Sequence, residues 1–226
     1  MAEPVDDWPN DQTFYPGPPK HLHAVGVLSS RYNAFEQLLF NLYIHHHERR
    51  KIPNLFSEQF YWSRDEQNRL TLLKDTFGEF EKGQKVRALI DNLSDYFSFC
   101  WDARNKILHG YVYPTLIANQ RELQLVMQAK KSRKRTYLNL DLTTIRELAD
   151  CIAIGRLQAA NIAIYLSFRD TPPSRRSLWL RMVGRQPLPE TLHIPKHLVK
   201  LVRRPNNPVP PSHTQPASAK RTTGHG

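Results

Sequence analysis

A ten-residue segment, residues 101–110, holds side chains whose types and spacing suit acid–base chemistry at a phosphate. Arg104 is followed five positions later by His109. An imidazole titrates near neutrality and can act as a general base or acid. A guanidinium carries a permanent charge that can stabilise the phosphorane-like transition state of phosphodiester cleavage. These two residue types therefore indicate a chemistry that needs no metal ion.

Arg104 occupies an unusual place, because it falls on the apolar face of a predicted helix. This helix runs from Gln84 to His109, and its apolar face repeats in steps of three and four. The face consists of Val86, Ile90, Leu93, Phe97, Cys100, Arg104 and Ile107. Burying a cation costs free energy unless a polar group meets it, so Arg104 needs either a partner or a function.

The other polar residues of the segment lie on a different face of the same helix. Asp102, Asn105 and His109 are spaced three and four apart and share one face. On an ideal helix, Arg104 and His109 point about 140° apart around the axis. Gly110 favours a helix end directly after His109. We therefore expect His109 to turn toward Arg104 because it is the last helical residue.

Two more helices are predicted before this one. The first covers residues 21–47 and the second covers roughly residues 57–80. The apolar face of the first helix consists of Leu28, Tyr32, Phe35, Leu39 and Leu42, and that of the second of Leu70, Leu73 and Phe77. Residues 1–20 are acidic and proline-rich, and they predict an irregular leader.

After the motif the pattern changes from helical to alternating. Residues 121–141 predict two short strands that form a β-hairpin around the loop at residues 130–135. A further helix follows, with apolar residues at helical spacing from Ile145 to Leu166. Either Asp141, or Thr144 with Glu147 three positions later, caps its start.

The motif resembles a known signature. Arg104-Asn105-Lys106-Ile107-Leu108-His109 is similar to the R-x4-6-H signature of HEPN-domain proteins, with the shortest permitted spacer. The resemblance extends over roughly residues 21–168 and includes Glu36 in the middle of an early helix. It implies an all-α fold: a HEPN-like helical bundle, here with a small β-hairpin insertion and a disordered C-terminal tail.

The resemblance also implies a function. Many HEPN proteins are metal-independent endoribonucleases of toxin–antitoxin, antiphage defence or RNA-processing systems, and they pair as homodimers whose motif helices face one another. By this resemblance His109 is the general base or acid, Arg104 stabilises the transferring phosphate, and Asn105 orients one of them. Glu36 and Asp102 are supporting residues. RNA is then the substrate, and an inhibitor or effector protein is an expected partner.

Five cations lie close together in the loop after the motif. Lys130, Lys131, Arg133, Lys134 and Arg135 would contact RNA phosphates and add affinity without sequence information. The alternative is a solvated hairpin tip. The hairpin and the tail depart from the common core of the family, so substrate choice does not transfer.

Charge is distributed unevenly along the 226 residues. The net charge is +11, yet residues 169–226 hold eleven Lys and Arg against two Asp and Glu, together with 10 of the 17 prolines. We expect residues 21–168 to form one helical domain and residues 169–226 to be a basic, proline-rich, disordered tail. The basic charge therefore does not by itself indicate that the domain binds nucleic acid.

Several classes of function lack support in the sequence. Cys100 and Cys151 are predicted to be buried thiols, without the spacing of a zinc site or a secreted disulfide scaffold. No nucleotide-binding or serine-nucleophile motif is present. The most apolar stretch, residues 151–166, is interrupted by polar residues and too short to span a bilayer. We expect a cytoplasmic protein with no cofactor, no metal and no membrane partner.

Three interpretations of the motif are compatible with the sequence. In the first the chain is the endoribonuclease described above. In the second Arg104 pairs with Glu36, His109 only caps its helix, and the chain is a non-catalytic dimeric helical module that binds a partner protein or nucleic acid. In the third the enzyme acts on another phosphodiester or transfers a nucleotidyl group.

Overall fold

The computed structural model describes the backbone of residues 19–50, 62, 64–109, 111–112, 122–128, 135–184 and 187–203. Most of these residues are helical, which confirms the predicted helical fold class. The elements are α1 Pro19–Arg50, α3 Glu66–Phe80, α4 Gln84–Leu108, β1 Tyr111–Val112, β2 Glu122–Gln128, β3 Arg135–Asp141, α5 Leu142–Asp170, α6 Pro173–Val183 and α7 Lys196–Arg203.

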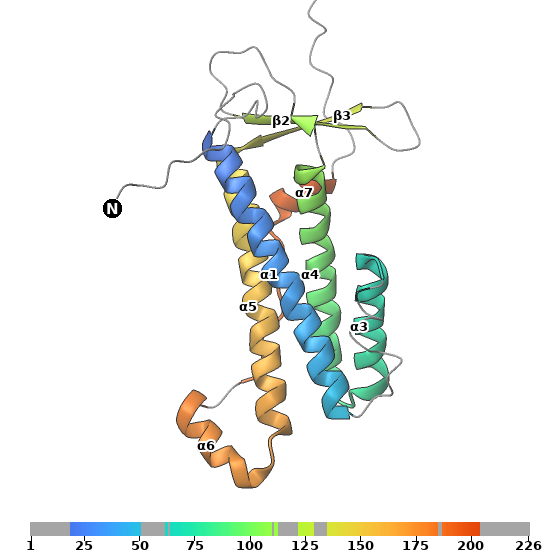
Figure 1. Ribbon diagram of the computed structural model, residues 1–226, viewed down its shortest axis with the longest axis vertical. Helices are drawn as coiled ribbons and strands as arrows, with labels where there is room; N and C mark the ends of the chain where they lie inside the picture. The colour runs from blue at the N-terminus through green and yellow to red at the C-terminus, as the bar shows by residue number, and fades with distance from the viewer. Residues whose placement is uncertain are drawn as a thin grey trace, which may run out of the picture.

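Three long helices, α1, α4 and α5, form the centre of the molecule (Figure 1). The predicted apolar faces of α1 and α4 are buried against one another, with Phe97 of α4 touching two rings of α1. The ring centroids lie 5.2 Å from Tyr32 and 5.0 Å from Phe35. Gly155 of α5 lies against Phe35, because a Cβ atom placed there would be 2.5 Å from that ring. A glycine therefore lets α5 approach α1 closely.

The helix α3 packs beside α4 and begins later than the sequence pattern suggested. Asp65 caps its start by accepting a hydrogen bond from the Asn68 backbone N–H at 2.8 Å. A salt bridge of 2.8 Å from Lys74 to Asp95 joins α3 to α4. The predicted start at residue 57 lies outside the described residues, and the described helix begins at Glu66.

The sheet lies at the end of the bundle where α4 ends and α5 begins (Figure 1). Its strands are antiparallel in the order β1-β2-β3, and Leu125 of β2 is paired with Leu138 of β3. The predicted hairpin is confirmed, whereas the short strand β1 was not predicted. Asp141 ends the sheet and caps α5 by accepting from the Thr144 backbone N–H at 2.6 Å, which decides between the two predicted caps.

The helix α5 is longer than its apolar repeat. At 29 residues it is long and apolar enough, by length and composition alone, to cross a membrane. Core helices of soluble proteins meet the same criterion, and one face of α5, including Ile145, Ile152 and Ile162, is buried in the bundle. This helix alone is therefore weak evidence for a membrane span.

The structure corrects the prediction of a disordered tail from residue 169. Arg169 lies in α5 and forms a bidentate ion pair with the buried carboxylate of Glu81. Its Nη1 donates to Oε1 at 3.0 Å and its Nη2 donates to Oε2 at 2.9 Å. Beyond it, α6 stands apart at the end of the bundle opposite the sheet (Figure 1). Residues 204–226 lie outside the described residues, as does the predicted leader up to residue 18.

Residues 187–195, here called the extended segment, return along α4 and α5. The side-chain amide of Asn92 donates to the Leu192 carbonyl at 3.1 Å and accepts from the Leu192 N–H at 2.7 Å. The buried amide of Gln158 donates to the carbonyl of Glu190. The following helix α7 buries Leu198 in the core. Part of the predicted tail is therefore folded, because the bundle satisfies its backbone polar groups and covers its apolar side chains.

Candidate functional site

The predicted motif lies at the C-terminal end of α4, next to the sheet. Cys100, Ala103 and Ile107 are buried on this part of the helix, and Arg104 lies among them with a partly buried side chain. His109 follows the last helical residue, and its backbone N–H donates to the Asn105 carbonyl at 2.9 Å. His109 is exposed to solvent, and Gly110 lies outside the described residues. The structure therefore presents a partly buried cation close in sequence to an exposed imidazole.

Arg104 is held by two neighbours. Its Nη1 donates to Asn105 Oδ1 at 2.8 Å. Its guanidinium carbon lies 5.2 Å from the ring centroid of Tyr32, in a cation–π arrangement. Asn105 was predicted to orient a member of the motif, and its side chain contacts Arg104. Tyr32 was predicted only as a core residue of the first helix.

The alternative in which Arg104 pairs with Glu36 is wrong. Glu36 accepts instead from Arg69 of α3, with 3.0 Å between Nη2 and Oε1, and Arg69 also lies 3.5 Å from Glu66. Burial raises the pKa of Glu36, although the charges of Arg69 and Arg104 act in the opposite direction. Arg104 is therefore close enough to Glu36 to affect it, yet forms no salt bridge with any carboxylate among the described residues.

Arg104 and His109 are not bonded to one another within one chain. Arg104 faces α1, and neither residue forms a hydrogen bond or ion pair with the other. His109 keeps the right-handed backbone of the helix, with φ −97° and ψ −2°, so its side chain continues the helical arrangement. The expected approach of His109 to Arg104 therefore does not appear as a hydrogen bond within one chain. Asp102 is partly buried and forms no ion pair with the described residues.

Tyr32 is the residue at this site that sequence reasoning missed. It is 2% exposed, and its hydroxyl is buried without a hydrogen-bond partner. Burial, reinforced by the charge of Glu36, raises the pKa of this hydroxyl far above its ordinary value, so it stays protonated. The only signal in the sequence was a hydroxyl on an otherwise apolar face, and that pattern is common in protein cores.

The predicted RNA-binding loop falls mostly outside the described residues. Lys130, Lys131, Arg133 and Lys134 lie there, and Arg135 begins β3 with a side chain that is not described. RNA binding by this loop therefore stays a prediction.

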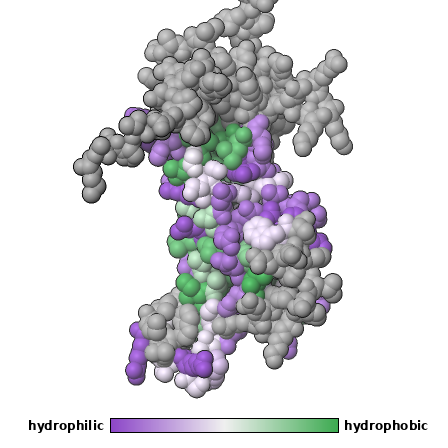
Figure 2. All heavy atoms as spheres, in the orientation of Figure 1, coloured by the Kyte–Doolittle hydropathy of each residue, from purple (hydrophilic) through white to green (hydrophobic). Residues whose placement is uncertain are grey.

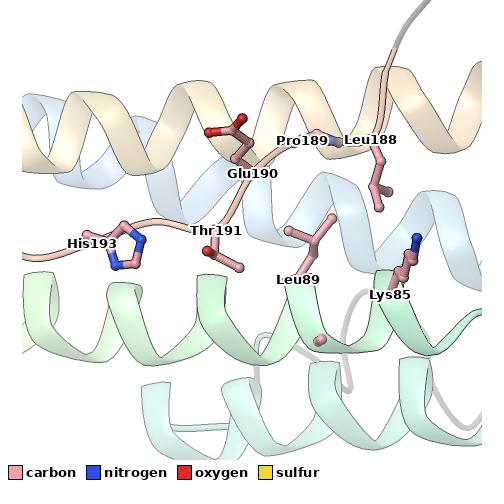
Figure 3. A pocket seen from close by; sticks show the side chains of 8 residues that line it. Lys85, Leu89, Leu188, Pro189, Glu190, Thr191 and His193 are labelled. Carbon is pink, nitrogen blue, oxygen red and sulfur yellow. The ribbon is translucent and has the colours of Figure 1, made fainter.

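Among the described residues, two surface cavities lie away from the motif. One cavity, of about 460 Å³, lies between the extended segment and the first half of α4. In Figure 3 Lys85 and Leu89 face this space from α4, and Thr191 points toward them. The helix rise puts Leu89 about 22 Å from Arg104 along α4, so this cavity is separate from the motif. The other, of about 290 Å³, lies between α1 and α5, where Arg31 forms a 2.5 Å ion pair with Asp150.

The thiols and the metal-binding residue types offer no second site. Cys100 and Cys151 are buried as predicted, and burial raises the pKa of both thiols, which makes them poor nucleophiles. Within the part of the chain that the structure describes, no three His, Cys, Asp or Glu residues gather as metal ligands would.

No protein-family model, curated protein or solved structure is detectably similar to this chain. The motif and the geometry around it are therefore the features of this chain that point to a function.

Proposed function

We propose that this chain is a metal-independent endoribonuclease of the HEPN type. One observation carries the proposal. Arg104 is a partly buried cation without a carboxylate partner among the described residues, and it shares a helix end with the exposed His109. A buried cation without a counter-charge is costly unless it serves a task. Stabilising a negatively charged transition state is such a task.

The proposed reaction is attack of a ribose 2′-hydroxyl on the neighbouring phosphodiester. His109 removes the proton from the attacking hydroxyl or delivers one to the leaving 5′-oxygen. Arg104 stabilises the charge that develops on the phosphorane-like transition state, and Asn105 holds the guanidinium in place. The products are a 2′,3′-cyclic phosphate and a 5′-hydroxyl.

We also propose that the active unit is a homodimer. Positions 104 and 109 of a helix point about 140° apart, and no hydrogen bond joins the two side chains, so we infer that one chain does not bring them to the same phosphate. A second copy that faces the motif helix would place the His109 of one chain opposite the Arg104 of its partner. Cytoplasmic location, a role in toxin–antitoxin or antiphage systems, and control by an inhibitor or effector protein belong to the same proposal.

The test is RNA cleavage by the purified chain in the presence of EDTA. The wild type is expected to cut single-stranded or structured RNA, and a strand with 2′-deoxyribose at the cleavage position is expected to resist. Arg104→Ala and His109→Ala should each lower the rate by at least about a hundredfold. Arg156→Ala and His23→Ala, at exposed positions on α5 and α1, serve as matched controls that keep wild-type activity. Wild-type activity in either motif variant would refute the mechanism.

A second candidate is a non-catalytic module that binds a partner protein. It is favoured by the exposed apolar residues of α5, where Ile154 is 52% and Leu157 is 61% exposed. Figure 2 shows apolar surface along the edge of the bundle that α5 forms in this view. Absence of RNA cleavage, together with a loss of partner binding in Leu157→Lys, would favour this candidate over the nuclease.

A further inference from the structure

Three buried hydrogen-bond donors near the motif lack an acceptor. They are the hydroxyl of Tyr32, Nε of Arg104 and Nε1 of Trp101. The guanidinium of Arg104 lies over the Tyr32 ring at 5.2 Å. Trp101 precedes Arg104 by one helical turn and shares its side of α4. Tyr32 and Arg104 therefore meet where α1 contacts α4, and Trp101 lies one turn earlier on α4.

The chemistry of these groups defines what is missing. An indole N–H and a guanidinium N–H can only donate, so neither can satisfy the other. The raised pKa of Tyr32 keeps its hydroxyl protonated and able to donate. Its oxygen can also accept, but neither N–H is hydrogen-bonded to it. Buried donors without an acceptor are rare in native proteins, and they indicate an unoccupied binding position or an ordered water. The group that fits is an oxygen with several lone pairs.

The local charges favour an anion over water. Glu36, whose pKa the charge of Arg104 influences, is paired with Arg69 at 3.0 Å and forms no ion pair with Arg104. Arg104 uses Nη1 for the neutral amide of Asn105 and keeps its positive charge without a counter-ion among the described residues. Arg104 and Trp101 are only partly buried, whereas Tyr32 is 2% exposed and lies in the core.

We propose that Tyr32, Trp101 and Arg104 together form a phosphate-binding site, in which the three donors receive phosphate oxygens. This inference rests on the proposed function, where the phosphate is the scissile phosphodiester of RNA. It adds Tyr32 and Trp101 to the site as binding residues. The shared ligand chemistry is a tetrahedral phosphate oxyanion, supplied either by a nucleic-acid backbone or by free phosphate.

The experiment follows the donors directly by ¹H–¹⁵N NMR of the full chain. The Trp101 indole and Arg104 Nε–H resonances are assigned by their loss in Trp101→Phe and Arg104→Lys. The chain is then titrated separately with inorganic phosphate and with a single-stranded DNA oligonucleotide, which lacks the attacking 2′-hydroxyl and is not cut. We expect saturable downfield shifts of both resonances, while the indole resonance of Trp62, whose ring lies against Arg69 and not against Arg104, stays in place.

Two tyrosine variants separate binding from folding. Tyr32→Phe keeps the ring under Arg104 and removes only the unpartnered hydroxyl, so it should weaken phosphate binding about five- to tenfold without loss of stability. Tyr96→Phe removes a buried hydroxyl that donates to the Cys151 carbonyl at 2.9 Å, so it should lose stability and bind phosphate as the wild type does. Equal phosphate binding by Tyr32→Phe and wild type would overturn the inference, as would unmoved Trp101 and Arg104 resonances.

These outcomes are distinct from failure of the proposed function. A chain that shows the shifts with either ligand but cuts no RNA keeps the phosphate site and loses the nuclease. If instead RNA is cut, and Tyr32→Phe has wild-type KM and kcat, the nuclease stands and the assignment of Tyr32 falls.

Discussion

Arg104 and Asn105 are joined through their side chains, with 2.8 Å between Nη1 of the arginine and Oδ1 of the amide. Adjacent residues of a helix point about 100° apart, so this contact draws the guanidinium toward the face that carries Asn105. The same guanidinium rests on the ring of Tyr32. The position of the motif cation is therefore fixed from two sides, by a neutral amide and by an aromatic ring.

The amide of Asn105 leads to a prediction about charge. Asn105→Ala should lower the RNA cleavage rate about ten- to a hundredfold, because the guanidinium loses its hydrogen bond and moves. Asn105→Asp should lower the rate further, since a carboxylate 2.8 Å from Nη1 would neutralise the charge that the transition state needs. Initial rates on one RNA substrate in EDTA measure both, and a faster Asn105→Asp than Asn105→Ala would contradict this role of Arg104.

Two glycines give a matched prediction about packing. A Cβ atom at Gly155 would lie 2.5 and 2.8 Å from two carbons of the Phe35 ring and 3.0 Å from the Tyr96 ring. Gly155→Ala should therefore destabilise the fold by about 1–3 kcal/mol, even though alanine favours a helix. Gly78 in α3 has nothing within 4 Å of such an atom, so Gly78→Ala should stabilise by about 0.5–1 kcal/mol. Urea unfolding measures both changes, and equal effects would show that α5 does not pack closely on α1.

The amide of Asn92 should control the extended segment. Asn92→Ala removes both hydrogen bonds to Leu192, which should cost about 1–3 kcal/mol. Hydrogen exchange should then accelerate in residues 187–195 more than in α1. Asn161→Ala, at a partly buried position on α5, is the control and should leave exchange in this segment unchanged. Unchanged protection in Asn92→Ala would mean that the apolar side chains alone hold the segment.

The buried carboxyl of Glu36 predicts a pH dependence with a defined sign. Its pKa is raised above the ordinary 4.5, mainly by burial, so the folded state binds this proton more tightly than the unfolded state. Its contribution to stability is therefore complete below pH 4.5 and declines as the pH rises through the raised pKa. The stability of the wild type relative to Glu36→Gln should fall over this range in urea unfolding series.

The carboxylate of Asp141 predicts a pH dependence of stability with the opposite sign. The Thr144 backbone N–H lowers the pKa of the Asp141 carboxylate, so its contribution is present above pH 3.8 and is lost as the pH falls through the lowered pKa. The stability of the wild type relative to Asp141→Asn should therefore decrease toward acid, while that relative to Glu36→Gln increases. If the stability difference between wild type and variant changed with pH in the same direction for Glu36→Gln and Asp141→Asn, burial would not be the cause of the raised pKa of Glu36.

The sequence determined the parts of the fold that depend on local periodicity. Steps of three and four placed Phe97, Cys100 and Arg104 on one face of α4, and alternation placed two strands after the motif, because side-chain direction within one element repeats with a fixed period. The sequence narrowed the cap of α5 to Asp141 or Thr144 for the same reason, since a cap contacts residues only two or three positions away, and the structure shows that Asp141 is the cap.

Only the tertiary structure decided which side chains meet across helices. In the folded chain Glu36 forms an ion pair with Arg69, and the guanidinium of Arg104 lies over the ring of Tyr32. Residues 187–203 have a proline-rich sequence with little regular pattern of its own. They are nevertheless ordered against the bundle, because the side-chain amides of Asn92 and Gln158 form hydrogen bonds with the backbone of this stretch. Such pairings depend on how helices are rotated and offset against one another, and that relation arises from packing of the whole chain and not from the spacing of residues within one element.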